Sequence, residues 1–469
     1  MIPHSPRQVR SDLDRDIEPL VVGGVRHGAS AIPARADVVV VGGGPAGSST
    51  AALLAKAGVD VVLLEKVKHP RNTVGESLIP HFWKFADKVG VSREIEQGGY
   101  LKKAGGITVW KGKIHQFSFE KFGYKRPALH VERDLFDDMV LRHAQASGAR
   151  VFEETAVTRV DLADPAALKV HYDDRRGGSS NPGLLTCKYV VDASGHNVVL
   201  AKQLGSRVIV GRGQQEYMAL WGYFEDARYV GADGKSYGPE CLPGIKPVTF
   251  VVSYEDGWIW HIILREHTSV GLVINTSSIK GMKRPQYEAY FKRIVESTPY
   301  LRELLRTAKF KEGSIRFMHD YSYYLTEVCG EGWFCIGDAG GFVDPIFSHG
   351  VQAAFYNANV VSVLVKGSLD RPSRAQEYRR HFDRRVRQYY GFSRSLALGD
   401  FGGDGVDAGL VKALMKQMPP IELEMMLVAS CISDRSTNFR NMAREAGVLG
   451  EFGDGFISGR HRYLPALEL

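Results

Sequence analysis

Short apolar runs alternate with small-residue and amphipathic stretches along the first two hundred positions of the chain. One β-branched run spans residues 37–41 and ends at Gly42, and a second spans residues 59–64 and ends at Glu65. The Ala-rich segment 48–57 between them predicts a helix that Gly58 terminates. This order of strand, helix and strand predicts a βαβ unit in a buried parallel sheet.

The same patterns divide the rest of the chain. Residues 247–252, 257–264 and 269–274 alternate apolar and polar positions and predict strands of a β-rich sheet. Residues 332–336 predict another buried strand, followed by a Gly-rich loop and a helix from about Val351. Because the chain has 469 residues, two or three subdomains are expected.

A glycine pattern joins the first strand to the first helix. It reads Gly42-Gly43-Gly44-Pro45-Ala46-Gly47, and Glu65 follows Gly42 by 23 positions (65 − 42). In a dinucleotide fold the first glycine makes the tight turn, the second admits the pyrophosphate and the third allows close helix packing. The acid at the end of the second strand then binds the adenosine ribose. Gly42, Gly44, Ala46, Gly47 and Glu65 are therefore predicted to bind a nucleotide-bearing cofactor.

One lysine follows this unit on a predicted helix. Pro80 suits the first helical position, which places Lys84 one turn into the helix that follows the Gly75-Glu76-Ser77 segment. An ammonium group there could reach the cofactor as a proton or hydrogen-bond donor. The alternative is a solvated helix lysine, since lysine is mostly exposed.

A second candidate cofactor segment follows the predicted strand 332–336. Asp338 comes directly after this strand, where its carboxylate could contact the ribityl and phosphate region of FAD. The Ser348-His349-Gly350 loop leads into the next helix, and a helix N-terminus offers N–H groups to an anion.

Four segments resemble those of the flavin-dependent halogenase family, a branch of the FAD monooxygenases built like p-hydroxybenzoate hydroxylase. They are the glycine fingerprint at 42–47, the Gly75–Lys84 segment, the Gly257-Trp258-Ile259-Trp260-His261-Ile262 pattern and the Asp344–Gly350 loop. The resemblance spans roughly residues 37–375. It implies an α/β fold: an FAD-binding, Rossmann-like domain, an interspersed β-sheet substrate domain and a helical C-terminal region.

The resemblance also implies roles for single residues. Lys84 takes the place of the catalytic lysine, and Arg133 contacts FAD. Ser348, His349 and Gly350 bind halide beside the flavin through backbone amides. Trp258 and Trp260 screen the flavin from a tunnel, although two aromatic residues on one face of a strand are also common in cores.

Two positions depart from the family pattern. Ile263 stands where the tryptophan pattern normally ends in Pro, and Phe347 stands where the indole-halogenating branch has a glutamate. The resemblance therefore implies a phenolic or pyrrole-like substrate, free or bound to a carrier protein, with Phe347 along the tunnel.

In the implied reaction, reduced FAD and O₂ oxidise chloride or bromide to hypohalous acid, which Lys84 directs to an electron-rich carbon of a natural-product precursor. Only one dinucleotide fingerprint is present, so a separate flavin reductase is expected to deliver FADH₂.

The resemblance suggests the following division of the chain. Residues 1–36 form an N-terminal extension. The FAD part comprises 37–97, 127–205 and 325–375, and the substrate sheet comprises 98–126 and 206–324. Residues 376–469 are expected to be mainly helical and to cap the substrate pocket.

Composition narrows the class further. The formal charge is +7, a mild excess that attracts anions but matches no nucleic-acid-binding module. The five cysteines lack paired spacing, and no histidine has partners at ligand spacing, so a reducing cytoplasm and no metal are expected. No run reaches the roughly 18 apolar residues of a membrane span.

Two alternatives stay open. One is an FAD monooxygenase or a geranylgeranyl-reductase-like flavoenzyme on the same scaffold. The other is a flavin-binding protein that has lost catalysis and serves as a partner or sensor.

Overall fold

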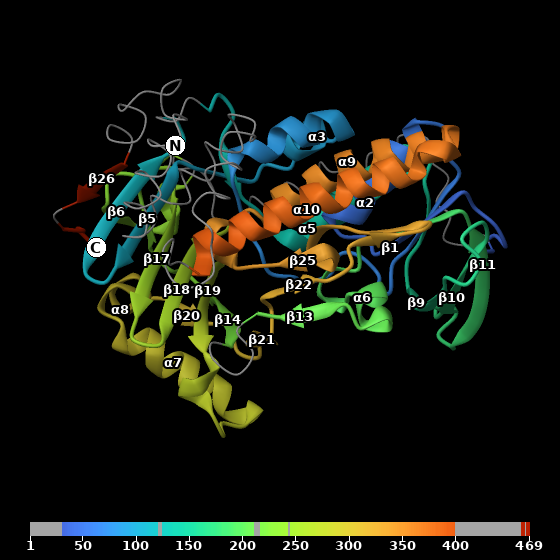
Figure 1. Ribbon diagram of the computed structural model, residues 1–469. Helices are drawn as coiled ribbons and strands as arrows, with labels where there is room; N and C mark the ends of the chain where they lie inside the picture. The colour runs from blue at the N-terminus through green and yellow to red at the C-terminus, as the bar shows by residue number, and fades with distance from the viewer. Residues whose placement is uncertain (1–30, 121–123, 211–215, 243, 399–460, 465) are drawn as a thin grey trace.

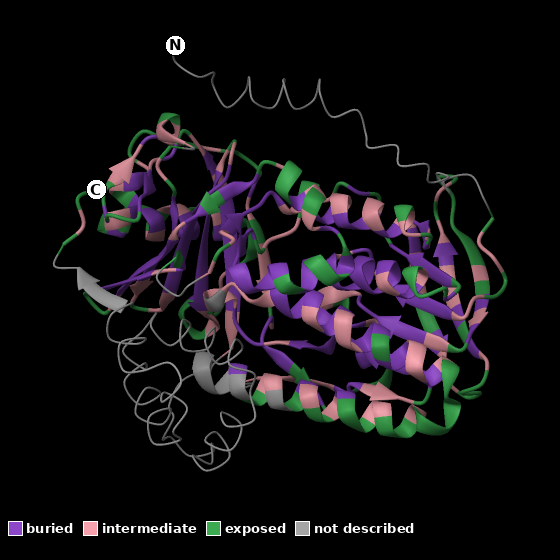
Figure 2. Cartoon of the chain, turned by 90° about the horizontal axis from the view of Figure 1, so that it is seen from above, coloured by how far each residue is buried: buried purple, intermediate pink, exposed green. Residues whose placement is uncertain are grey.

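The computed structural model describes residues 31–120, 124–210, 216–242, 244–398, 461–464 and 466–469. Two large sheets lie side by side, with most of the helices over the first and a helix pair on the second (Figure 1). Buried residues concentrate in the strands and on the helix faces turned toward them (Figure 2).

The first sheet contains the predicted βαβ unit. Its strand order is β23 (Cys329–Gly330), β24 (Trp333–Cys335), β12 (Tyr189–Asp192), β1 (Val38–Val41), β2 (Val61–Leu64) and β8 (Arg150–Phe152). All neighbours are parallel except β23 and β24. The helices that pack with this sheet are α2 (Pro45–Lys56), α5 (Arg133–Ala146) and α9 (Gly350–Asp370), and α10 (Ala375–Leu398) lies along α9 (Figure 1).

The second sheet contains the strands predicted in residues 247–274. Its strand order is β20 (Lys309–Phe310), β14 (Tyr217–Glu225), β19 (Thr268–Asn275), β18 (Gly257–Ile263), β17 (Val248–Tyr254), β5 (Gly105–Trp110), β6 (Lys113–Ser118) and β26 (His461–Leu464). A further strand, β21 (Arg316–His319), also pairs with β14. Period-2 alternation gives this sheet two different faces. One packs on α7 (Tyr287–Ser297) and α8 (Pro299–Leu304), and the other carries Trp221, Trp258 and Trp260.

A small three-stranded sheet consists of β3 (Ser77–Leu78), β7 (Ala128–His130) and β4 (Leu101–Lys103). Its register places Ser77 and Leu101 on either side of His130. This sheet brings together residues from three separate stretches of the chain.

The remaining elements are short or peripheral. They are α3 (Trp83–Val89), α4 (Ser92–Gln97), α6 (Val199–Leu204), the sheet of β9 (Thr155–Asp161), β10 (Leu168–Asp174) and β11 (Asn181–Cys187), the sheet of β13 (Arg207–Ile209), β22 (Tyr323–Leu325) and β25 (Gly341–Phe342), and the pair β15 (Tyr229–Val230) and β16 (Ser236–Tyr237).

The predicted α/β class is confirmed. The elements predicted for the two ends of the chain can be compared with the structure only in part. Residues 1–30 and 399–460 lie outside the described part, so most of the expected N-terminal extension and C-terminal cap is not compared. In the region expected to be mainly helical, α10 is a helix but β26 is a strand paired with β6. Within the described residues, no helix is both long and apolar enough to cross a bilayer.

Candidate active site

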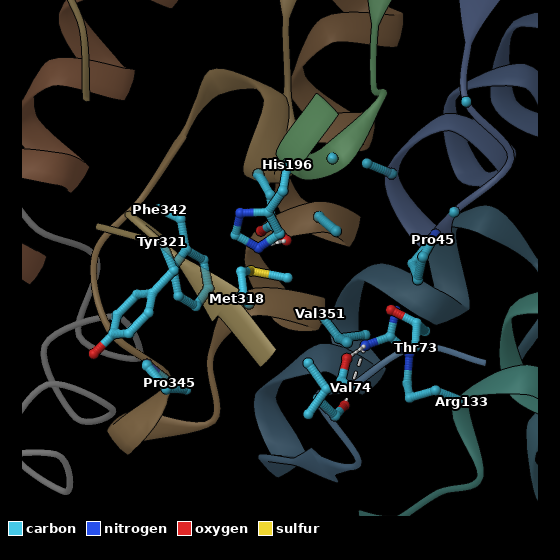
Figure 3. A pocket seen from close by; sticks show the side chains of 18 of the residues that line it. Pro45, Thr73, Val74, Arg133, His196, Met318, Tyr321, Phe342, Pro345 and Val351 are labelled. Atoms are coloured by element: carbon cyan, nitrogen blue, oxygen red, sulfur yellow. Dashed lines mark hydrogen bonds and ion pairs between the residues drawn. The ribbon is translucent and has the colours of Figure 1, made fainter. Parts of the chain in front are cut away.

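A cavity of about 790 Å³ lies between the two large sheets. The glycine fingerprint, the loop 71–77, the tryptophan-bearing sheet face and the segment 338–354 all line it. Figure 3 shows residues of the fingerprint helix, of the loop 71–77 and of the segment 338–354 around one space. The two motif regions at 42–47 and 338–350 therefore meet at one cavity, although about 300 residues separate them.

The fingerprint glycines have the packing roles predicted for them. Gly42 has a φ of +101°, and a Cβ there would stand 2.5 Å from the carbonyl oxygen of Ala193. A Cβ on Gly47 would stand 1.9 Å from the carbonyl oxygen of Gly42, so only glycine lets α2 approach β1 this closely.

Gly44 has a different reason to be glycine. A Cβ there would meet only the Arg71 guanidinium, at 3.4 Å, and both residues line the cavity. Since no protein atom requires a glycine at this position, the open space suits a ligand that approaches the backbone. Ala46 is buried and also lines the cavity.

Glu65 lies at the end of β2, as predicted. Its carboxylate is buried, and it accepts hydrogen bonds from the backbone N–H of Gly43 at 2.6 Å and of Val67 at 3.0 Å. Each carboxylate oxygen has a second lone pair, so the group can still accept from a ribose hydroxyl.

Arg133 begins α5 and fixes the loop that precedes Ser77. Its Nε donates to Asp137 at 2.8 Å. Its Nη1 donates to the carbonyls of Val74 at 2.9 Å and Gly75 at 3.2 Å (Figure 3). Arg133 lines the cavity, and Arg71 stands 3.5 Å from the same Asp137. Two guanidinium groups are thus held at the cavity edge, which suits an anionic cofactor.

Asp338 lies in the turn after β24, also as predicted. One carboxylate oxygen stands 3.4 Å from Nε2 of His196, and both residues line the cavity. Burial lowers the pKa of His196. Asp338 can therefore accept a hydroxyl of the cofactor chain.

The predicted halide loop forms the entrance to α9. Ser348 has a φ of +56°, and α9 begins at Gly350. The first N–H groups of an α-helix have no partner within the helix, so this turn presents donors to an anion. Burial lowers the pKa of His349 to about 4, so this imidazole is neutral near pH 7. The side chain of Phe347 lies outside the description.

Trp258 and Trp260 form a wall of the cavity. Both are buried and line it, with ring centroids 5.9 Å apart. The indole N–H of Trp260 donates to Ser269 at 3.1 Å, and Ser269 lies 3.4 Å from the buried carboxyl group of Glu76. Burial raises the pKa of Glu76, which also accepts from Tyr223 at 3.0 Å.

The interpretation that the Lys84 ammonium reaches into the site is wrong, and the alternative, a solvated helix lysine, is confirmed. The neighbouring Trp83 and Phe85 are buried, which turns Lys84 outward, and it is exposed. Its Nζ lies 5.6 Å from the ring centroid of Phe85. Lys84 is not among the described residues that line the cavity.

A different lysine lies behind the cavity wall: Lys103 is not itself a lining residue, but it contacts two residues that are. Lys103 is 3% exposed, and its Nζ donates to Ser77 at 2.5 Å and to Thr249 at 3.1 Å. Both hydroxyl-bearing residues line the cavity. Burial lowers the pKa of Lys103 to about 7.

Ser77 also joins Lys103 to the predicted halide loop. The hydroxyl of Ser348 donates to Ser77 at 2.9 Å, so one hydroxyl separates Ser348 from the lysine amine. Lys103 was not predicted from the sequence. Its signal was strand alternation, since β4 reads Leu101-Lys102-Lys103 and places Lys103 on the same face as the buried Leu101.

Comparisons with known proteins show the family of the chain. The FAD binding domain family matches residues 35–364, which is more than half of the chain. A tryptophan 2-halogenase of Chondromyces crocatus is 33% identical over 359 residues, 74% of this chain and 65% of that protein. The chain thus spans about two thirds of that relative. A 1H-pyrrole-2-carbonyl-[peptidyl-carrier protein] chlorinase of Pseudomonas fluorescens is 33% identical over 70% of this chain and 74% of its own length.

Solved structures show the same fold. The myxobacterial chondrochloren halogenase CndH has a TM-score of 0.69 and 27% identity, covering 91% of this chain and 93% of its own. The halogenase CmlS has a TM-score of 0.70 at 24% identity, covering 89% of this chain and 78% of its own, a likeness of fold alone. The cavity is lined by the fingerprint glycines Gly42 and Gly44, by the anchored Glu65 and by Arg71 and Arg133, a set that suits a dinucleotide. The chain belongs to the flavin-dependent halogenase family and has FAD as its cofactor.

Proposed function

We propose that the protein uses FADH₂, O₂ and chloride or bromide to halogenate an electron-rich aromatic compound, with Lys103 in the role first predicted for Lys84. One observation carries this proposal. The hydroxyls of Ser348 and Ser77 connect the N-terminal turn of α9 to a buried lysine, with successive distances of 2.9 and 2.5 Å.

The cofactor residues hold FAD against this connection. Gly44 and the adjacent helix α2 receive the pyrophosphate, Arg71 and Arg133 neutralise it, and Glu65 and Asp338 accept hydroxyls of the adenosine ribose and the ribityl chain. Bound in reduced form, FAD supplies with O₂ the oxidising equivalents that convert halide to hypohalous acid.

The turn at Ser348, His349 and Gly350 holds the halide. Its N–H groups and the positive end of α9 favour an anion. Because His349 is neutral near pH 7, backbone donors rather than an imidazolium charge attract the halide at this turn.

Lys103 acts on the hypohalous acid. With a pKa of about 7, a large share of the amine is unprotonated near neutral pH. It either donates a hydrogen bond to the acid or takes the halogen as a haloamine, with loss of water. The aromatic carbon then receives the halogen, and its proton is released as the amine is restored. Trp258 and Trp260 exclude water from the part of the cavity that holds the cofactor.

The substrate proposal rests on the site and on the relatives. A phenolic or pyrrole-like compound fits an electrophilic halogen, and one relative is a chlorinase of a carrier-bound pyrrole. Another is a tryptophan 2-halogenase, although Phe347 here replaces the glutamate expected for indole. A carrier-bound substrate therefore belongs in the test panel beside a free phenol and tryptophan.

Two further features complete the proposal. A separate flavin reductase supplies FADH₂, because the chain has one dinucleotide fingerprint. The cytoplasm suits the protein, since Cys187 and Cys335 are buried free thiols.

The test is product analysis by mass spectrometry. FADH₂, O₂, bromide or chloride and the three substrates are supplied, and the halogenated mass is sought. The wild-type protein and the Lys84→Ala variant should both halogenate, whereas the Lys103→Ala variant should bind FAD and give no product. A hydroxylated product would instead assign the chain to the monooxygenases, and rapid NADPH oxidation by the protein alone would contradict the need for a reductase.

A further inference from the structure

A buried histidine lies behind the proposed catalytic lysine. His130 is fully buried on β7, and its two ring nitrogens have different partners. Nδ1 lies 3.0 Å from the carbonyl oxygen of Ile263, and Nε2 lies 3.0 Å from the hydroxyl of Thr249. That hydroxyl also accepts from Lys103. His130 therefore contacts a hydrogen-bond partner of the lysine and not the lysine itself.

These partners determine which nitrogen carries the proton. A carbonyl oxygen only accepts hydrogen bonds, so Nδ1 must donate to Ile263. Burial holds the pKa of His130 well below its usual value, so the ring is neutral and has a single N–H. Nε2 is consequently an acceptor, and the hydroxyl of Thr249 must donate to it.

The remaining hydrogen bonds follow from this one. Because the single hydrogen of Thr249 is directed to His130, the 2.9 Å contact between Thr249 and Ser77 requires Ser77 to donate. The two lone pairs of Ser77 then accept from Lys103 and Ser348, as the structure shows. The direction of every hydrogen bond in the group is thereby fixed.

The direction matters for the amine of Lys103. The hydroxyls of Ser77 and Thr249 both accept from the Lys103 amine. An unprotonated amine therefore donates its two N–H groups to these hydroxyls and keeps its lone pair free. If His130 donated through Nε2, the Thr249 hydrogen would be released and could turn to that lone pair. A lone pair engaged in this way is a poorer nucleophile.

We propose that His130 is a positioning residue: by accepting the hydroxyl hydrogen of Thr249, it keeps that hydroxyl and the hydroxyl of Ser77 as acceptors, and so leaves the lone pair of Lys103 free for an electrophilic halogen. The idea that the lone pair takes up an electrophilic halogen rests on the proposed function. The orientation itself does not, and it can be measured without halogenation.

The titratable groups around Lys103 are few in the described residues. His130 faces it from β7, and the buried Glu76 precedes Ser77. His261 on β18 lies beyond His130, and burial lowers its pKa to about 4. The ring of Phe119 lies 5.4 Å from Nζ.

The test measures the reactivity of Lys103 toward cyanate, a small electrophile that carbamylates neutral amines. The full-length protein is labelled at about pH 9, where the amine is mostly unprotonated, and peptide mass spectrometry follows each lysine. Loss of His130 frees the hydroxyl hydrogen of Thr249, and loss of the Thr249 hydroxyl frees that of Ser77, so in either variant a hydroxyl can turn to the lone pair of Lys103. We therefore expect labelling of Lys103 to be about tenfold slower in His130→Ala and in Thr249→Val. The exposed Lys84 serves as an internal standard in every sample.

Two variants control for packing. Thr249→Ser keeps the hydroxyl and should label within about twofold of the wild type. His261→Ala removes another buried imidazole from the same region and should do the same. A purely structural role for His130 would loosen the site and accelerate labelling, which is the opposite direction. Thr249→Val retains the side-chain volume, so the comparison survives if His130→Ala does not fold.

The outcomes separate the two proposals. Slower labelling of Lys103 in both network variants, with both controls unchanged, supports the role of His130. Unchanged or faster labelling, or an equal fall in His261→Ala, overturns it. Slower labelling in a protein that halogenates no substrate would leave the orientation standing and refute the proposed function.

Discussion

The burial of Lys103 predicts a stability that depends on pH in a specific way. Its pKa falls from 10.5 to about 7 in the folded protein, so between these values the unfolded chain holds a proton that the folded chain lacks. The free energy of unfolding therefore rises with pH across this window, by about 1.4 kcal/mol per pH unit. Over the whole window the group accounts for about 5 kcal/mol, and below about pH 7 the cost of the buried charge is present in full.

Replacement of Lys103 by Met removes this dependence while it keeps most of the side-chain volume. The Met variant should be the more stable protein at low pH, and its advantage should shrink as the pH rises. Between about pH 7.5 and 9.5 the difference in free energy of unfolding should fall by about 2–3 kcal/mol. Other titrating groups contribute equally to both proteins and cancel in the difference.

The measurement is urea unfolding followed by tryptophan fluorescence at the two pH values, with the same excess of FAD. Lys84→Met is the matched control, because its side chain is exposed, and its effect should stay within about 0.5 kcal/mol at both values. A Lys103→Met advantage that is identical at the two pH values would refute the reasoning, since it would show that the folded and unfolded lysines bind protons alike.

Four other changes test separate parts of the site. Gly47→Ala should abolish FAD binding or folding, because its Cβ would stand 1.9 Å from a backbone oxygen; flavin fluorescence and soluble yield report this. Glu65→Ala should weaken FAD binding about tenfold, measured by equilibrium dialysis, as it removes two backbone contacts and a ribose acceptor. Ser348→Ala should lower the halogenation kcat about tenfold and leave FAD affinity unchanged. Trp260→Ala should lower the free energy of unfolding, measured by urea titration, by about 3–5 kcal/mol.

The sequence predicted what depends on local geometry. Gly42, Glu65 and Asp338 lie at strand ends in motifs whose backbone conformation is fixed within a few residues, and each lies where it was expected. The position of the Lys84 side chain was predicted incorrectly because burial is a tertiary property. Lys84 sits in a familiar motif but faces solvent, whereas Lys103 has no motif of its own and is buried by strands distant in sequence.

Arg71 and His196 were also missed, for the same reason. Neither lies in a recognisable sequence pattern. Each lines the cavity because of the path that the loop 71–77 or the turn after β12 takes in the folded chain. Side chains that reach a site from loops are set by the path of the whole chain, which periodicity does not encode.

The parallel pairing of β5 with β17 has a consequence for how the protein is made. It joins residues 105–109 to residues 248–252, and the strands β8 and β12 of the other sheet lie between them in the chain. During synthesis, β5 and β6 leave the ribosome well before β17, the partner of β5, and before β26, the second partner of β6. A chain that stalls before residue 248 would therefore expose an unpaired hairpin edge, and exposed edges of this kind recruit chaperones or aggregate.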